Sequence, residues 1–268
     1  MDSVDALKRI SRLHPLTLRQ KMARTNAAHD LEREQDVLLR DIRIGDASFL
    51  EMYRACRAAT GTPREPAEKF LSRPLKVLAL ARYFQQVLEH RVPGGFAECG
   101  VFRGLTALML ARLSAGRGEL FLVDSFEGLS ATGPHDDAVW VDPGTGNIHH
   151  GASGQRFEQT DFDAVCALFA GHPDTMVLKG WIPDIFAQLP DEPWAFVHVD
   201  VDLHDPTRAC LEHFWPRLSP GGIVLCDDYV TPLYPGAMRA MDDFCTQHEL
   251  EPLILDTGQA VLRKPAAT

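Results

Sequence analysis

The sequence predicts an α/β protein with a doubly wound, mostly parallel sheet. Beyond residue 95, short apolar runs of strand length alternate with helical stretches about five times. The chain has 268 residues, of which 45% are hydrophobic, enough for the core of one large domain. The last segment, 252–264, differs because the turn-like "DTGQ" joins two short apolar runs. It predicts an antiparallel hairpin at the end of the sheet.

Residues 1–75 predict a helical appendage, and residues 76–268 the main domain. The first region is charge-rich, carries Leu, Ile and Met at three- and four-residue spacings, and is interrupted at Pro15, Gly45 and "TGTPREPAEKF". We expect this appendage to mediate dimerisation or to cover a site, which makes a homodimer the expected assembly. A long amphipathic helix begins near residue 73 and ends at Pro93, whose ring and following glycines stop it.

The main domain then follows a regular order. The expected strands are 96–101, 119–126, 175–180, 195–203 and 221–229. The expected helices are 104–116, 160–172, 206–218 and 236–248. A long polar connection separates the second strand from the helix that begins at residue 160.

Charge and cysteine content limit the function classes. The formal charge of −10 disfavours nucleic acid and anionic membranes as partners, so a small neutral or cationic molecule or a metal ion is expected. The six cysteines show no CxxC or zinc-like spacing, which is typical of reduced thiols in a cytoplasmic protein. The first residues lack a signal-peptide pattern, and no apolar stretch is long enough for a membrane span.

Polar residues follow the predicted strands, where ligands bind in open parallel sheets. The turn "ECGVFRG" lets a ligand approach the backbone at Gly100 and Gly104, but it lacks the GxGxxG pattern of a dinucleotide site. The carboxylate of Glu98 suits a cationic ligand such as S-adenosylmethionine, and Asp124 is placed for ribose hydroxyls. The alternative is that both acids only cap loops.

The second group of polar residues consists of aspartates. Asp200 and Asp227 are 27 residues apart, enough for one crossover helix and one return strand. Adjacent strands lie about 4.8 Å apart, so we expect Asp200, Asp227 and Asp228 to converge. Without a nearby lysine they would repel one another, and oxygen ligands favour Mg²⁺ or a similar hard cation. The alternative is a set of helix-capping or hydrogen-bonded acids.

Several motifs together resemble the macrocin O-methyltransferase family, whose members act on sugars of macrolides and related natural products. They are "VPGGFAECGVFRG", "LVDSFEGL", "VHVDVDL", "RLSPGGIVLCDDY" and "GAMRAMDDF", and they cover roughly residues 70–262. The resemblance implies a class I methyltransferase fold with Mg²⁺ held at Asp200, Asp227 and Asp228. It also implies S-adenosylmethionine contacts from Glu98, Gly100, Asp124 and Ser125. We extend this set of cofactor contacts by four neighbouring residues and one metal ligand: Arg103, Phe126, Gly180, Trp181 and Asp200.

The acceptor and the general base are less specified. Where the family usually continues "DLYEST", this chain has "DLHDPT", and the segment 130–157 matches no family motif. The candidate bases are Asp200, His204, His149 and His150, although each histidine is equally consistent with a loop residue; His198 fits a core histidine better. The alternatives are a methyltransferase acting on a catechol-like or other hydroxyl, a non-catalytic S-adenosylmethionine-binding protein, and a nucleotide-dependent oxidoreductase.

Overall fold

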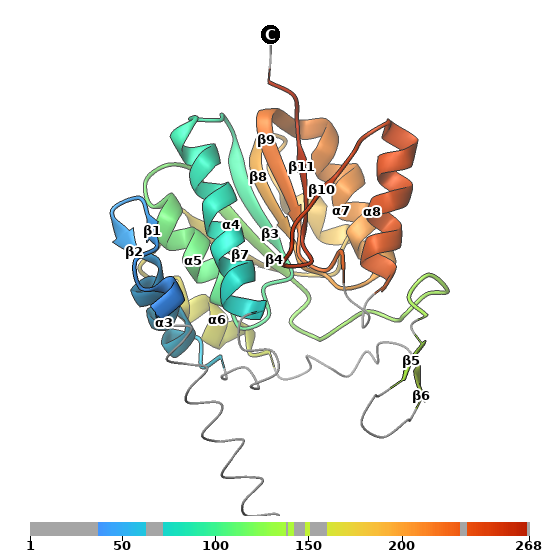
Figure 1. Cartoon of the computed structure of the whole chain (residues 1–268), viewed down its shortest axis with the longest axis horizontal. Coiled ribbons are helices and arrows are strands. Elements are labelled where there is room, and N and C mark those ends of the chain that lie inside the picture. Colours follow the sequence, from blue (N-terminus) through green and yellow to red (C-terminus); the bar gives the residue numbers. More distant parts are fainter. Residues whose placement is uncertain are drawn as a thin grey trace, which may run out of the picture.

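The computed structural model describes residues 37–62, 72–137, 139–141, 148–150, 160–230 and 235–266, with only the backbone described at 72, 139–141 and 148–150. It confirms the α/β class, with helices packed on both faces of one large sheet (Figure 1). The strands of this sheet are β3 (Gly95–Cys99), β4 (Leu120–Asp124), β7 (Thr175–Lys179), β8 (Trp194–Val199), β9 (Leu218–Cys226), β10 (Leu253–Ile254) and β11 (Ala260–Arg263).

The strand order places a ligand crevice near the middle of the sheet. The order is β10-β11-β9-β8-β3-β4-β7, and β11 runs antiparallel to both of its neighbours, as the sequence predicted for a terminal hairpin. From β3 the chain moves outward through β4 to β7, then returns to the other side of β3 as β8 and β9. The switch point of the topology therefore lies between β3 and β8, where ligands bind at the carboxyl ends of strands.

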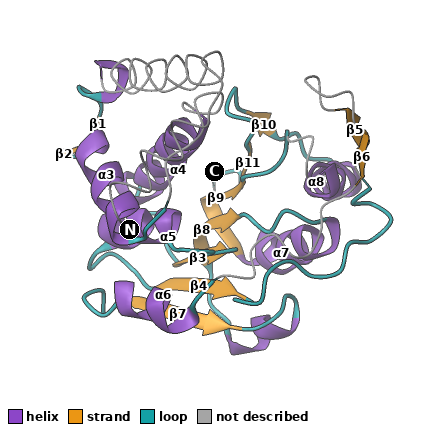
Figure 2. Ribbon diagram, turned by 90° about the horizontal axis from the view of Figure 1, so that it is seen from below, coloured by secondary structure: helices purple, strands orange, loops and turns teal. Residues whose placement is uncertain are grey.

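Two apolar cores cover the two faces of the sheet, and alternate residues of each strand enter opposite cores. One face packs on α3 (Phe49–Ala59), α4 (Ser72–Glu89), α5 (Leu105–Ser114) and α6 (Phe162–Leu168). The other packs on the 3₁₀ helix η2 (Asp184–Gln188), α7 (His204–Arg217) and α8 (Pro235–His248). Figure 2 shows α4 and α5 separated by the sheet from α7 and α8.

Local sequence explains where these helices begin. The Asp161 side chain accepts hydrogen bonds from the backbone of Asp163 and Ala164, so α6 begins one residue later. The α5 helix begins after Gly104, whose φ of 85° is a left-handed conformation that glycine adopts readily. The α4 helix ends at Glu89, before Pro93, because Arg91 already has a positive φ of 51°.

Much of the N-terminal region expected as an appendage lies outside the described residues, namely 1–36 and 63–71. The described part holds a small hairpin of β1 (Arg43–Ile44) and β2 (Ala47–Ser48), followed by α3. Phe49, Tyr53 and Cys56 of α3 are buried in the core that also contains α4 and α5. The domain boundary near residue 75 stays a prediction. No helix among the described residues has the length and apolar character needed to cross a membrane.

The long polar connection contains a second small hairpin, β5 (Val139–Val141) and β6 (Ile148–His150). It stands away from the sheet beyond α8 in Figure 1. The sequence did not predict these two strands.

Candidate functional site

A cavity of about 530 Å³ opens at the carboxyl ends of the central strands. This volume falls in the range of small-molecule sites, about 300–1,000 Å³. Its walls come from strand ends β3, β4, β7, β8 and β9, and from the first turns of α4 and α5. The cavity therefore lies at the switch point that the strand order defines.

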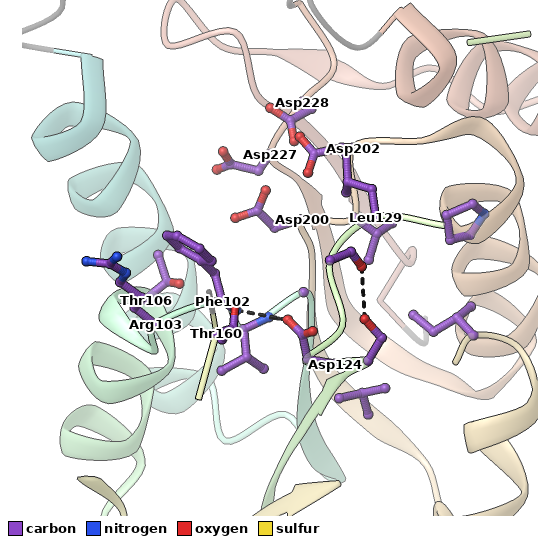
Figure 3. Close-up of a pocket in the computed structure, with 18 of the residues that line it drawn as sticks. Phe102, Arg103, Thr106, Asp124, Leu129, Thr160, Asp200, Asp202, Asp227 and Asp228 are labelled. Atoms are coloured by element: carbon purple, nitrogen blue, oxygen red, sulfur yellow. Dashed lines mark hydrogen bonds between the residues drawn. The ribbon is translucent and has the colours of Figure 1, made fainter. Parts of the chain in front are cut away.

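The loop after β3 forms one wall of the cavity, and Asp124 holds it in place (Figure 3). One carboxylate oxygen of Asp124 accepts hydrogen bonds from the backbone N–H of Val101 at 2.7 Å and of Phe102 at 2.9 Å. The other accepts the N–H of Phe126 at 2.7 Å. The acid at the end of β4 therefore organises the loops on both sides of the cavity, in addition to lining it.

Backbone strain gathers around the same cavity. Phe102, Phe126 and Asp202 have φ values of 50°, 55° and 62°. Residues other than glycine rarely adopt this left-handed backbone region. They persist only where the surrounding structure holds them in it, and they cluster at ligand sites. Each of the three follows the end of a central strand, β3, β4 or β8.

The structure brings most of the predicted cofactor residues to the cavity. The predicted cofactor residues that line the cavity are Gly100, Arg103, Asp124, Ser125, Gly180, Trp181 and Asp200. Glu98 and Phe126 are not part of the wall. Glu98 is fully buried on β3 and accepts a hydrogen bond from the Thr106 hydroxyl on α5. Its position therefore fixes α5 against the sheet behind the cavity.

Four aspartates converge at one side of the cavity (Figure 3). Asp200 follows β8, Asp227 and Asp228 follow β9, and oxygens of these three lie within 4.8 Å of one another. Asp202 lies beside them, which sequence reasoning did not include in the cluster. The pairing of β8 with β9 produces this convergence, since Asp227 N–H donates to the Val199 carbonyl at 2.8 Å.

A lysine reaches this cluster, contrary to the premise of the sequence reasoning. The Lys76 Nζ on α4 lies 2.7 Å from Asp227 Oδ2 and 3.6 Å from Asp228 Oδ1. Burial lowers the pKa of Lys76, but Asp227 and Asp228 outweigh it, so the pKa lies above its ordinary value and the amine stays charged. The sequence feature that could have indicated this contact is Lys76 itself, a single cation within the apolar run "PLKVLALA" at 74–81.

The negative charge of Asp227 is more fully compensated by surrounding donors and cations than the charges of the neighbouring aspartates. Its Oδ1 accepts from Gln259 Nε2 at 2.7 Å and lies 3.6 Å from His198 Nε2, while its Oδ2 holds Lys76. Burial alone would raise the pKa of Asp227, but His198 and Lys76 lower it well below its usual range. This carboxylate is ionised and already bound by protein donors.

Protein donors and cations compensate less of the negative charge on Asp200, Asp202 and Asp228. Burial raises the pKa of Asp200 and Asp202 well above its usual range, and the neighbouring carboxylates raise it further. The pKa of Asp228 is raised by burial and by Asp227, and its Oδ2 is buried without a hydrogen-bond partner among the described residues. These oxygens form a set of hard donors with an excess of negative charge, which fits a divalent cation such as Mg²⁺.

The histidines have different places. His198 is fully buried, as expected for a core histidine, yet its Nδ1 lies 3.3 Å from Glu98 Oε1 as an ion-pair contact. Burial lowers the pKa of His198, but Asp227 and Glu98 outweigh it and hold the pKa above its usual range. From β8 it therefore links Glu98 on β3 to Asp227 at the end of β9.

The candidate base His204 does not line the cavity. Its ring stacks on His135 at 4.2 Å, its Nδ1 lies 2.7 Å from Asp205 Oδ1, and its backbone N–H donates to the buried Asp136 at 2.7 Å. The side chains of His149 and His150 lie outside the described part of the chain. Of the four candidate bases, Asp200 is thus the one that the described structure places at the cavity.

Comparison with known proteins indicates one family of enzymes. The family described as macrocin-O-methyltransferase (TylF) matches residues 73–262. The chain is 32% identical over 151 residues to the 8-demethyl-8-(2,3-dimethoxy-alpha-L-rhamnosyl)-tetracenomycin-C 4'-O-methyltransferase of Streptomyces olivaceus. This match covers 54% of the chain and 56% of the relative, so the chain spans little more than half the length of that protein.

Solved structures share the fold. The O-methyltransferase NovP superposes with a TM-score of 0.62 at 19% identity, over 81% of this chain and 98% of that one. An O-methyltransferase from Bacillus cereus in complex with SAH superposes with a TM-score of 0.53 at 16% identity, over 87% of this chain and 100% of that one. At such low identity the likeness establishes the class I methyltransferase fold alone.

Proposed function

Because the chain belongs to the macrocin O-methyltransferase family, we propose that it transfers a methyl group from S-adenosylmethionine to a hydroxyl group of a small natural product, with a sugar hydroxyl as the acceptor. The observation that carries this proposal is the carboxylate cluster of Asp200, Asp227 and Asp228 in the wall of a cavity at the switch point of the sheet. The Streptomyces relative, whose name describes a 4'-O-methyltransferase of a rhamnosyl compound, supports a sugar acceptor.

The residues of the cavity fit S-adenosylmethionine, which supplies an activated methyl group. Trp181 is 40% exposed although it is a large aromatic residue, and it lines the cavity beside Gly180. Such a surface suits an adenine ring. On the neighbouring strand end, Asp124 offers an acceptor for ribose hydroxyls. The acidic character of the cavity suits a ligand that carries sulfonium and ammonium charges.

The aspartate cluster fits Mg²⁺, which supplies Lewis acidity that lowers the pKa of a hydroxyl group. Asp200, Asp227 and Asp228 are the residues that would hold it. The buried Oδ2 of Asp228, unpartnered within the described part of the chain, supports this assignment, since a buried carboxylate oxygen without a donor is costly. Lys76 already neutralises part of Asp227, so the uncompensated charge that favours an ion lies mainly on Asp200, Asp202 and Asp228.

Asp200 is our proposed proton acceptor for the attacking hydroxyl. It lines the cavity between the cofactor wall and the rest of the cluster, and it is the candidate base that the described structure places there. The side chains of Phe102 and Leu129 form apolar parts of the wall (Figure 3).

Removal of divalent ions should abolish methyl transfer, and Mg²⁺ should restore it. We would incubate the protein with labelled S-adenosylmethionine and two kinds of acceptor, deoxyhexosyl natural products with vicinal hydroxyls and simple catechols, before and after exhaustive chelation. We expect Mg²⁺-dependent labelling of the sugar acceptors. Full turnover after chelation would contradict the metal, and preferential labelling of catechols would contradict the sugar acceptor.

Replacement of Asp124 by alanine should weaken S-adenosylmethionine binding by about 1.5–3 kcal/mol, since it removes a charge-assisted hydrogen bond to the ligand. The change also leaves the N–H groups of Val101 and Phe102 without their acceptor, which adds to the loss. Isothermal titration calorimetry measures the effect. Asp191→Ala is the matched control because the Asp191 side chain is 96% exposed. An unchanged dissociation constant in a folded Asp124→Ala protein would assign Asp124 to loop structure alone.

A further inference from the structure

Lys76 is a cation that the fold itself supplies to the aspartate cluster. It comes from α4, 151 residues before Asp227 in the chain. Its Nζ donates to Asp227 Oδ2 at 2.7 Å and to the Asp227 backbone carbonyl at 2.9 Å. The two contacts hold the amine at one residue, and 24% of its side chain is exposed. This pair is therefore a specific, half-buried interaction rather than a mobile surface salt bridge.

Gln259 on the approach to β11 reinforces the same arrangement. Its Nε2 donates to Asp227 Oδ1 at 2.7 Å and to the Lys76 backbone carbonyl at 3.3 Å. Both carboxylate oxygens of Asp227 are thus engaged by protein donors, and the α4 backbone is tied to the end of β9. A divalent ion that uses Asp227 must therefore bind beside one of these donors, at a lone pair that the donor leaves open.

Lys76 and a divalent ion would repel each other if both were bound at Asp227. A full positive charge held within a few ångströms of a divalent cation repels it strongly in a site of low dielectric constant. The other cluster members lie close enough for one ion to contact them together with Asp227, since the ligand oxygens are within 4.8 Å of one another. The ammonium group and the ion therefore compete for the same carboxylate.

We propose that Lys76 is a positioning residue that occupies Asp227 in the metal-free protein and leaves it when a divalent cation binds. This inference rests on the proposed function, because it requires that the cluster bind such an ion. Without the ion, Lys76 offsets the repulsion within the cluster and keeps the ends of β8 and β9 together. When the ion binds, the amine is released from Asp227. Because Arg73 and Val77 of α4 also line the cavity, occupancy of the cluster is coupled to one wall of the ligand site.

The test is to titrate MgCl₂ into wild-type protein, Lys76→Met and Lys76→Arg by calorimetry, and to measure the melting temperature of each metal-free protein. Methionine keeps most of the length of the side chain without its charge. We expect Lys76→Met to bind Mg²⁺ about tenfold more tightly, because a competing charge is removed. Its metal-free form should melt about 5–10 °C lower, because a buried carboxylate loses its partner. Lys76→Arg keeps the charge and should remain close to wild type in both measurements.

Lys179→Met is the matched control. Lys179 pairs with Glu127 at 3.4 Å on the surface, with 44% of its side chain exposed, and should give wild-type values. Equal or weaker Mg²⁺ binding by folded Lys76→Met, while the wild type binds Mg²⁺, would overturn the role of Lys76 and leave the proposed function intact. If neither protein binds Mg²⁺, both the metal assignment and the competition fail, whereas binding by Lys76→Met alone would support strong competition.

Discussion

Replacement of Asp200 by asparagine should reduce methyl transfer by about 10²–10⁴-fold, the usual contribution of a positioned general base. The asparagine side chain keeps the shape of the aspartate but can neither take up a proton nor contribute charge to the cluster. S-Adenosylmethionine binding should fall much less than turnover, because its other proposed contacts lie at the ends of β3, β4 and β7. The metal-free protein should become more stable, since burial and the Asp227 and Asp228 carboxylates already disfavour the charged form of Asp200.

Asp227→Asn is the matched comparison for this prediction, and it should change stability in the opposite direction. Mutual repulsion among the three aspartates, which is all that the sequence indicates, predicts that removing the charge of Asp227 stabilises the metal-free protein slightly. The contacts of Asp227 with Lys76, Gln259 and His198 reverse that expectation, because the substitution leaves a half-buried ammonium without its carboxylate.

Turnover, cofactor affinity and the melting temperature of the metal-free protein would be measured on both variants. Wild-type turnover by Asp200→Asn would exclude Asp200 as the base. A lower melting temperature for Asp200→Asn, together with a higher one for Asp227→Asn, would contradict a cluster in which the charge of Asp227 is compensated and that of Asp200 is not.

The sequence was sufficient for the central architecture because that architecture depends on local patterns. Apolar runs of strand length separated by helical stretches define β3, β4, β7, β8 and β9, and the turn near Thr257 defines the last hairpin. Since parallel strands all end at one edge, the convergence of Asp200 with Asp227 also follows from their position at strand ends.

The compensation of charge within the site could not be predicted in this way. Lys76 and Gln259 meet Asp227 through packing of α4 and β11 against β9, over separations of 151 and 32 residues. Residue spacing carries no information about such contacts. The position of His204 was unpredictable for a related reason: it follows a strand whose end faces the cavity, but it begins α7, and its ring lies against His135 instead.

Replacement of Gly100 by alanine should destabilise the protein strongly. Gly100 has a φ of 90°, which is strained for a residue with a side chain, by roughly 1–2 kcal/mol. A Cβ atom there would also stand 1.8 Å from the backbone carbonyl oxygen of Asp200. Backbone cannot swing aside as a side chain can, so β3 and β8 must separate locally, at a further cost of about 1–3 kcal/mol.

Gly116→Ala separates these two contributions. Gly116 also has a positive φ, 69°, but none of the described residues places an atom within 4 Å of a Cβ built there. We expect it to lose only about 1 kcal/mol from backbone strain, whereas Gly100→Ala should lose about 2–5 kcal/mol and melt roughly 10 °C lower. If thermal and urea unfolding gave equal losses of unfolding free energy in the two variants, the backbone at the end of β8 would move away from a Cβ atom at residue 100 at little cost. A larger loss at Gly100 would mean that the close approach of β3 and β8 is rigid, and it is this approach that sets Asp200 beside the cofactor wall.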